Sequence, residues 1–66
     1  MKEAIRYIDR IKNEQKRKYA AAWFNYRRGF YGAPDFLDFG VSYMAAQGVR
    51  LQLDALLNVS REQIEP

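Results

Sequence analysis

The sequence predicts an all-α fold: a helical hairpin of two long antiparallel helices, followed by a short C-terminal helical turn. Residues 3–28 contain neither glycine nor proline, and apolar residues recur there at helical spacing. Residues 29–34, which contain Gly and Pro, then separate this first segment from a second apolar stretch. We expect the 66 residues to form a single small domain, 1–66. Because a core of this size is marginal, we expect oligomerisation or a partner protein to complete it.

The first predicted helix covers about residues 3–28, which are rich in good helix formers. At about 100° per residue, one side forms a core stripe flanked by Ile5 and Trp23. Its members are Ala4, Tyr7, Ile8, Ile11, Gln15, Tyr19, Ala22 and Tyr26. The opposite side is basic and collects Lys2, Arg6, Arg10, Arg17, Arg27 and Arg28.

A turn is predicted at residues 29–34. Gly29 suits the position just after a helix, where the backbone is left-handed, and Pro34 cannot continue the first helix. Asp35 is typical of an N-cap. The second helix is therefore expected over about residues 35–58. Ser60 and Gln63 have capping-box spacing, which favours a short helical turn in the tail, 59–66.

The second predicted helix has apolar residues on three sides, more than one partner helix can cover. One side carries Leu37, Val41, Met44, Leu51, Ala55 and Val59; a second carries Phe39, Ala46, Leu53 and Leu57; a third carries Ala45, Val49 and Leu56. Gly40, Ala45, Ala46 and Gly48 are small enough to let another helix approach closely. We therefore expect this helix to bury two faces, one of them against another molecule.

The composition argues against catalysis and cofactors. The chain has no Cys and no His, which removes disulfides and the main zinc ligands, and it has no glycine-rich phosphate loop. Its serines have no neighbouring base, and its carboxylates are dispersed. We expect no enzyme activity, cofactor, metal or small-molecule substrate. No apolar run is long enough to cross a membrane, and charges fill the N-terminal region where a signal peptide would be hydrophobic, so a cytoplasmic location is expected.

Aromatic residues and arginines crowd into residues 23–36, the stretch WFNYRRGFYGAPDF. In one interpretation these rings close the end of the core, and Arg27 and Arg28 are solvated. In the other they bind a partner. Phe24 supports the second interpretation, because on a continuous helix it falls on the basic side, where an apolar ring needs an explanation.

The function predicted from these patterns is a protein–protein interaction module, either a homo-oligomer or a small subunit or inhibitor of a larger protein. Such a chain would suit a bacterial or phage accessory protein. The predicted partner-binding residues are Phe24, Arg17, Arg27, Arg28, Val49, Leu53 and Leu56.

Nucleic-acid binding through the basic side is the alternative. Residues 1–33 hold nine Lys/Arg against three Asp/Glu, a net charge of +6, whereas residues 34–66 hold two against five, a net charge of −3. A helix with such a basic side can neutralise phosphates. The residues predicted for this role are Lys2, Arg6, Arg10, Lys16, Arg17 and Arg28.

Overall fold

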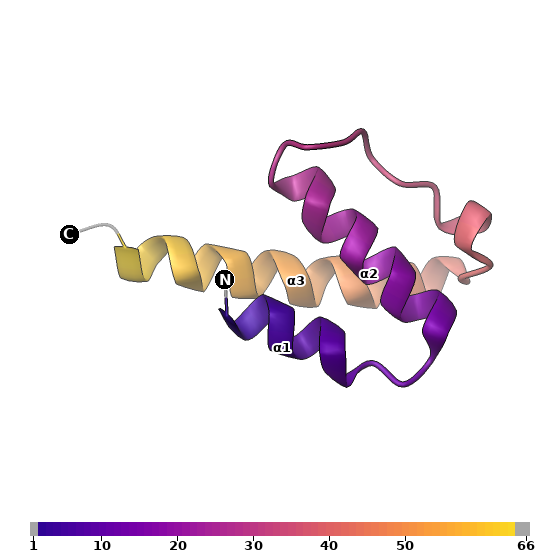
Figure 1. Cartoon of the computed structure of the whole chain (residues 1–66), viewed down its shortest axis with the longest axis horizontal. Helices are drawn as coiled ribbons and strands as arrows, with labels where there is room; N and C mark the ends of the chain where they lie inside the picture. Colours follow the sequence, from indigo (N-terminus) through magenta and orange to yellow (C-terminus); the bar gives the residue numbers. More distant parts are fainter. Residues whose placement is uncertain (1, 65–66) are drawn as a thin grey trace.

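The computed structural model describes the backbone of residues 2–64 and the side chains of residues 2–58. The elements are helix α1 (Lys2–Arg10), helix α2 (Glu14–Arg27), a short 3₁₀ helix η1 (Phe36–Phe39) and helix α3 (Tyr43–Ile64) (Figure 1). The predicted all-α class is confirmed, and the residues described contain no strand. The architecture is nevertheless three helices instead of a two-helix hairpin.

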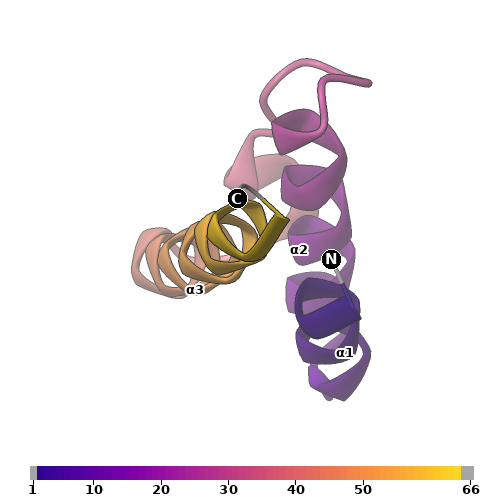
Figure 2. The same ribbon diagram turned by 90° about the vertical axis from the view of Figure 1, so that its left-hand side faces the viewer.

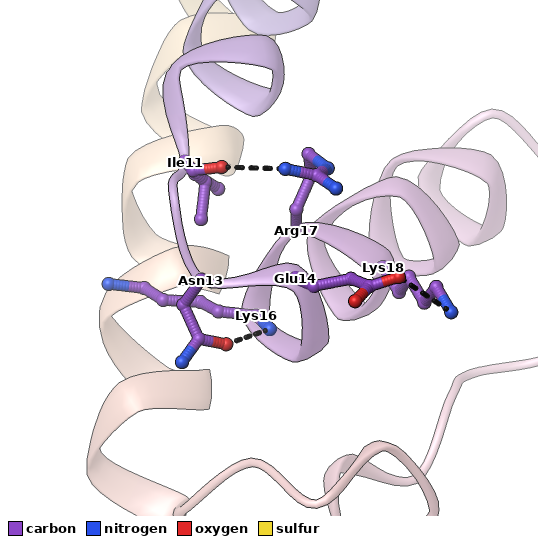
Figure 3. A network of polar contacts seen from close by, with 6 residues as sticks. All are labelled: Ile11, Asn13, Glu14, Lys16, Arg17 and Lys18. Atoms are coloured by element: carbon purple, nitrogen blue, oxygen red, sulfur yellow. Dashed lines mark hydrogen bonds and ion pairs between the residues drawn. The ribbon is translucent and has the colours of Figure 1, made fainter.

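The predicted helix over residues 3–28 is interrupted between Arg10 and Glu14. Asn13 has an extended backbone and caps α2, its Oδ1 accepting a hydrogen bond from the Lys16 amide at 2.9 Å (Figure 3). The Arg17 side chain donates to the Ile11 carbonyl at 3.2 Å, which gives a partner to a backbone group that the end of α1 leaves outside the helix. Residues of good helix propensity therefore form two helices, because an asparagine side chain can replace the backbone bond at the break.

This interruption changes which side of α2 faces the core. Ala20 and Phe24 are buried together with Ala4 and Ile8. On an uninterrupted helix Ala20 would point about 160° away from Ala4. The core stripe predicted for one continuous helix is thus correct for Ala4, Ile8 and Tyr19 and wrong for Gln15, which is exposed.

The C-terminal end of α2 forms as predicted. Gly29 has φ +87°, the Gly29 amide donates to the Tyr26 carbonyl, and the Phe30 amide donates to the Asn25 carbonyl. These two bonds form a Schellman motif, which requires a left-handed residue at the position of Gly29. The chain then continues without regular structure to Asp35.

The second long helix begins later than predicted. Asp35 is a cap, as expected, but its Oδ1 accepts from the Leu37 amide at 3.0 Å and caps only η1. Gly40, with φ +69°, ends this short helix. Ser42 Oγ then accepts from the Ala45 amide at 3.2 Å at the start of α3. A left-handed glycine followed by a capping serine thus separates the predicted helix 35–58 into two parts.

Helix α3 extends past the predicted end near residue 58 and through Ser60 to Ile64. The separate turn expected in residues 59–66 is therefore replaced, as far as Ile64, by continuation of α3. Residues 65 and 66 lie outside the described part of the chain, as do the side chains of residues 59–64.

The helices form two layers. In Figure 2, α1 and α2 lie on one side of α3, and no described segment covers its opposite side. Among the side chains that the structure describes, nine apolar ones are buried in the core between the layers: Ala4, Ile8, Tyr19, Ala20, Phe24, Val41, Ala46, Val49 and Leu53. Tyr19 packs edge-on against Phe39, with ring centroids 5.8 Å apart, and burial raises the pKa of its phenol. The core therefore covers only one face of α3.

Candidate interaction surfaces

Three of the predicted partner-binding residues belong to the core. Val49 and Leu53 have no exposed surface, and Phe24 is only 6% exposed. They cannot contact a partner while the chain keeps this fold, so their assignment to a binding surface is wrong. Phe24 is buried because the break at Asn13 turns its side of α2 towards α3, a change that helical periodicity alone does not predict. Leu56 is half-buried and packs against the core.

Arg27 joins α2 to α3. Its Nε lies 3.3 Å from Asp54 Oδ1, and the same oxygen accepts a hydrogen bond from Trp23 Nε1 at 3.1 Å. The Arg50 guanidinium also lies over the Trp23 ring, 5.6 Å from its centroid. Two α2 side chains, Arg27 and Trp23, thus share one carboxylate on α3. Arg27, which was predicted to bind a partner, therefore makes a contact that joins two helices of its own chain.

Arg28 and Arg17 also make contacts within the chain. The Arg28 guanidinium lies 5.2 Å from the Phe24 ring centroid and 5.0 Å from that of Phe30, which is 64% exposed. Arg28 therefore covers the outer side of a core ring. Of the rings that one interpretation of residues 23–36 placed in the core, Phe30 is excluded by its exposure, whereas Phe36 does pack against the core, as does the neighbouring Phe39. Arg17 is half-buried and holds the α1–α2 connection through Ile11.

An apolar stripe remains exposed along α3, and we call it the α3 stripe. It consists of Met44, Gly48, Leu51 and Ala55. Met44 is 82% and Leu51 is 66% exposed. The spacing of four, three and four residues keeps all four within about 60° of one another, and about 160° from the direction of the buried residues Ala46, Val49 and Leu53.

The sequence contained the signal for this stripe but did not distinguish it from the core. Met44, Leu51 and Ala55 were grouped on one apolar side of the helix, yet the predicted binding residues came from the other two sides. All three sides are apolar, and the choice between them depends on where α1 and α2 pack. The expectation that this helix has a second apolar face is consistent with the α3 stripe.

The residues predicted to bind nucleic acid separate into two groups. Lys2, Arg6 and Arg10 follow one another at four-residue spacing and are exposed on α1. Lys16 and Arg17 are half-buried at the start of α2, and Arg28 is stacked on rings at its other end. The structure therefore places three of the six on one exposed helical row.

Most of the other exposed large apolar side chains lie in or directly beside the connection between α2 and α3. Besides Phe30, Tyr31 is 72% and Leu37 is 70% exposed, and Tyr43 is 58% exposed although it contacts Phe36 edge-on at 5.7 Å. These residues come from loop, 3₁₀ and helical segments and share no regular spacing. They form a less ordered surface than the α3 stripe.

An open hollow of about 380 Å³ lies between Asn13, Lys16, Gly40 and Ser42, and no carboxylate, cysteine or histidine lines it. Over the part of the chain that the structure describes, no three carboxylates gather closely enough to hold a metal ion. Among the same residues, no helix is both long enough and apolar enough to cross a membrane.

Comparisons with protein-family models, curated proteins and solved structures found no match to this chain. The surfaces described above are therefore the basis for inferring its function.

Proposed function

We propose that this chain is a non-enzymatic protein–protein interaction module whose contact surface is the α3 stripe. The observation that carries the proposal is the exposure of Met44 and Leu51 in register with Gly48 and Ala55 along one helix face. Single exposed apolar residues are common on proteins and need no explanation, but a regular apolar row on a helix is typical of a helix that packs against something.

The composition of the stripe also suits a helical contact. Large side chains alternate with small ones, so that the row has projections at Met44 and Leu51 and hollows at Gly48 and Ala55. Side chains of another helix pack best into such alternating surfaces, since ridges then enter grooves. A contact of this kind is compatible with a homo-oligomer and with a small subunit or inhibitor of a larger protein.

The proposal can be tested by placing a charge in the stripe. Replacing Leu51 with Glu should leave thermal stability within about 0.5 kcal/mol of the parent, because this side chain is largely exposed. It should abolish association, because the carboxylate would be buried without a partner in the contact. Association is measured as molar mass by light scattering and as recovery of bound proteins by quantitative mass spectrometry from the source cell.

Tyr31→Glu is the matched control, since Tyr31 is equally exposed but lies outside the stripe. The proposal requires that the parent and Tyr31→Glu form the same oligomer or recover the same bound protein, and that Leu51→Glu lose this association. If all three proteins have the same mass and recover the same proteins in equal amounts, the α3 stripe is not a contact surface.

Nucleic-acid binding is the second candidate, and the exposed row of Lys2, Arg6 and Arg10 on α1 favours it. A short helical row of three cations would bind phosphates weakly, with little sequence preference. Replacing all three with Gln should then remove the salt-dependent binding of a fluorescent oligonucleotide while leaving association through α3 unchanged. If the parent and the triple Gln variant bind the oligonucleotide equally well, this row is not a phosphate-binding surface.

A further inference from the structure

We infer that the α3 stripe pairs with the same stripe of a second copy of this chain, with the two α3 helices antiparallel across a two-fold axis. This inference rests on the proposed function and specifies its partner. It is carried by the order of residue sizes along the stripe and by its charge, and the length of the stripe sets the expected strength of the pair.

The order of sizes is large, small, large, small: Met44, Gly48, Leu51, Ala55. When two such helices run antiparallel about a point midway between Gly48 and Leu51, each large residue faces a small one. Met44 lies opposite Ala55 of the second copy, and Leu51 lies opposite Gly48 of the second copy. A two-fold interface must be complementary to itself, and this row has that property.

Parallel pairing does not have this complementarity. In that arrangement each residue faces its own equivalent, so that Leu51 meets Leu51 and Gly48 meets Gly48. Large residues would then hold the helices apart at one level, and the glycines would leave a gap at the next. Interfaces pack about as densely as protein interiors, which favours the antiparallel register.

The charge distribution supports a second copy as the occupant. The chain has a net charge of +3, and its basic residues are concentrated in the first half of the sequence. The α3 stripe has no charged member, and the exposed residues beside it on α3 include the neutral amides Gln47, Gln52 and Asn58. Two copies can thus approach through this face without a charge in the stripe itself, Asp54 at its edge is paired with Arg27 of its own chain, and the amides can donate and accept across the contact.

The length of the stripe sets the expected strength of the pair. Residues 44 to 55 span eleven helical steps, or about 16 Å. A stable interface buries roughly 800 Å² on each partner, which is more than three helical turns alone can supply. The expected dimer is therefore weak and forms as the protein concentration rises.

The first experiment fills the hollow at Gly48. No atom lies within 4 Å of a Cβ built at this position, so Gly48→Leu is accommodated in the single chain. In the antiparallel dimer the new side chain would collide with Leu51 of the second copy. Light scattering over a concentration series should show the parent rising from 7.8 kDa towards twice that mass. The dissociation constant of Gly48→Leu should be higher by about tenfold or more.

A swap of the two sizes provides the matched rescue. The double variant Gly48→Leu with Leu51→Gly has the order large, large, small, small, and antiparallel pairing again sets each large residue against a small one. It should recover most of the parent's association, with helicity followed by circular dichroism to show that each variant remains folded. If Gly48→Leu associates as well as the parent, or if the folded swap variant does not recover association, the inference is wrong.

The antiparallel direction is tested by cross-linking, which is simple because the chain has no native cysteine. Met44→Cys and Ala55→Cys are mixed in equal amounts, oxidised, and the products identified by mass. A disulfide needs Cα atoms within about 7 Å, whereas two copies of residue 44 would be about 16 Å apart in the antiparallel dimer. The mixed disulfide should dominate. A statistical mixture, or a majority of Met44→Cys homodimers, would overturn the antiparallel register.

These outcomes also separate the inference from the function on which it rests. A parent protein that stays at 7.8 kDa at every concentration is not a homodimer, and the inference then fails. If such a monomer still retains a cellular protein that Leu51→Glu loses, the interaction function stands with a different partner. If it retains none, both fail.

Discussion

The two apolar faces of α3 have similar compositions and opposite environments. Ala46, Val49 and Leu53 have no exposed surface, whereas Met44 and Leu51, less than one helical turn away from them, are mostly exposed. The difference is where α1 and α2 lie, since both pack on one side of α3 (Figure 2). The comparison teaches that apolar periodicity shows how much of a helix can be buried, whereas the neighbouring elements determine which part is buried in the single chain.

Replacing Leu53 and Leu51 with Ala should separate the two faces most clearly. Leu53→Ala leaves a cavity in the core and should cost about 3 kcal/mol, a large part of the stability of so small a domain. Leu51→Ala removes an exposed side chain and should change the free energy of unfolding by about 0.5 kcal/mol or less. Urea unfolding at low protein concentration measures both values. Equal losses would mean that Leu51 is buried in the single chain, contrary to the structure.

Phe24 and Phe30 offer the same comparison around one arginine, because Arg28 contacts both rings. Phe24→Ala should cost about 3 kcal/mol, since the ring belongs to the core. Phe30→Ala should cost less than about 1 kcal/mol, since it loses only an exposed cation–π contact. Thermal unfolding followed by circular dichroism gives the two values. A Phe24→Ala protein as stable as the parent would restore Phe24 as a candidate for partner binding.

The sequence predicted the features that depend on local chemistry. The all-α class, the left-handed Gly29 and the cap at Asp35 follow from propensity and from backbone geometry, and all three are present. The interruption at Asn13 also has a local cause, but asparagine inside a helix-forming segment is not decisive by itself, because tertiary packing determines whether its side chain caps a helix.

The candidate site was less predictable than the fold. Once α1 and α2 are separate helices, their buried sides need not share one stripe, and the residues assigned to binding from periodicity, above all Phe24, change sides. Val49 and Leu53 were assigned to the contact because three sides of the second helix were apolar and no local rule ranked them. The packing of α1 and α2 supplies that ranking, and it is a property of the whole fold.

Asp54 tests the polar link between α2 and α3. Asp54→Asn keeps an oxygen that can accept from Trp23 Nε1 but removes the charge facing Arg27. Because both side chains of this ion pair are more than one-third exposed, the variant should lose only about 0.5 kcal/mol of stability. Asp54→Ala also removes the acceptor and should cost about 1–2 kcal/mol. Unfolding in low and high salt separates the terms, because salt screens the ion pair with Arg27 that both variants lose, whereas the difference between the two costs comes from the Trp23 hydrogen bond and should persist. Identical costs for the two variants would show that the Trp23 hydrogen bond contributes nothing.

A small residue on each face of α3 gives a further comparison of the two faces. Gly48→Ala should raise the free energy of unfolding by up to about 1 kcal/mol, because alanine has the higher helix propensity and no atom lies within 4 Å of the added Cβ. The reverse change on the core face, Ala46→Gly, should lower it by at least about 1 kcal/mol, since Ala46 is fully buried and its methyl group also packs. Both are measured by denaturant unfolding under dilute conditions, where association does not contribute. A destabilised Gly48→Ala protein would mean that the space beside Gly48 is filled within the single chain, and the hollow that the antiparallel pairing requires would not exist.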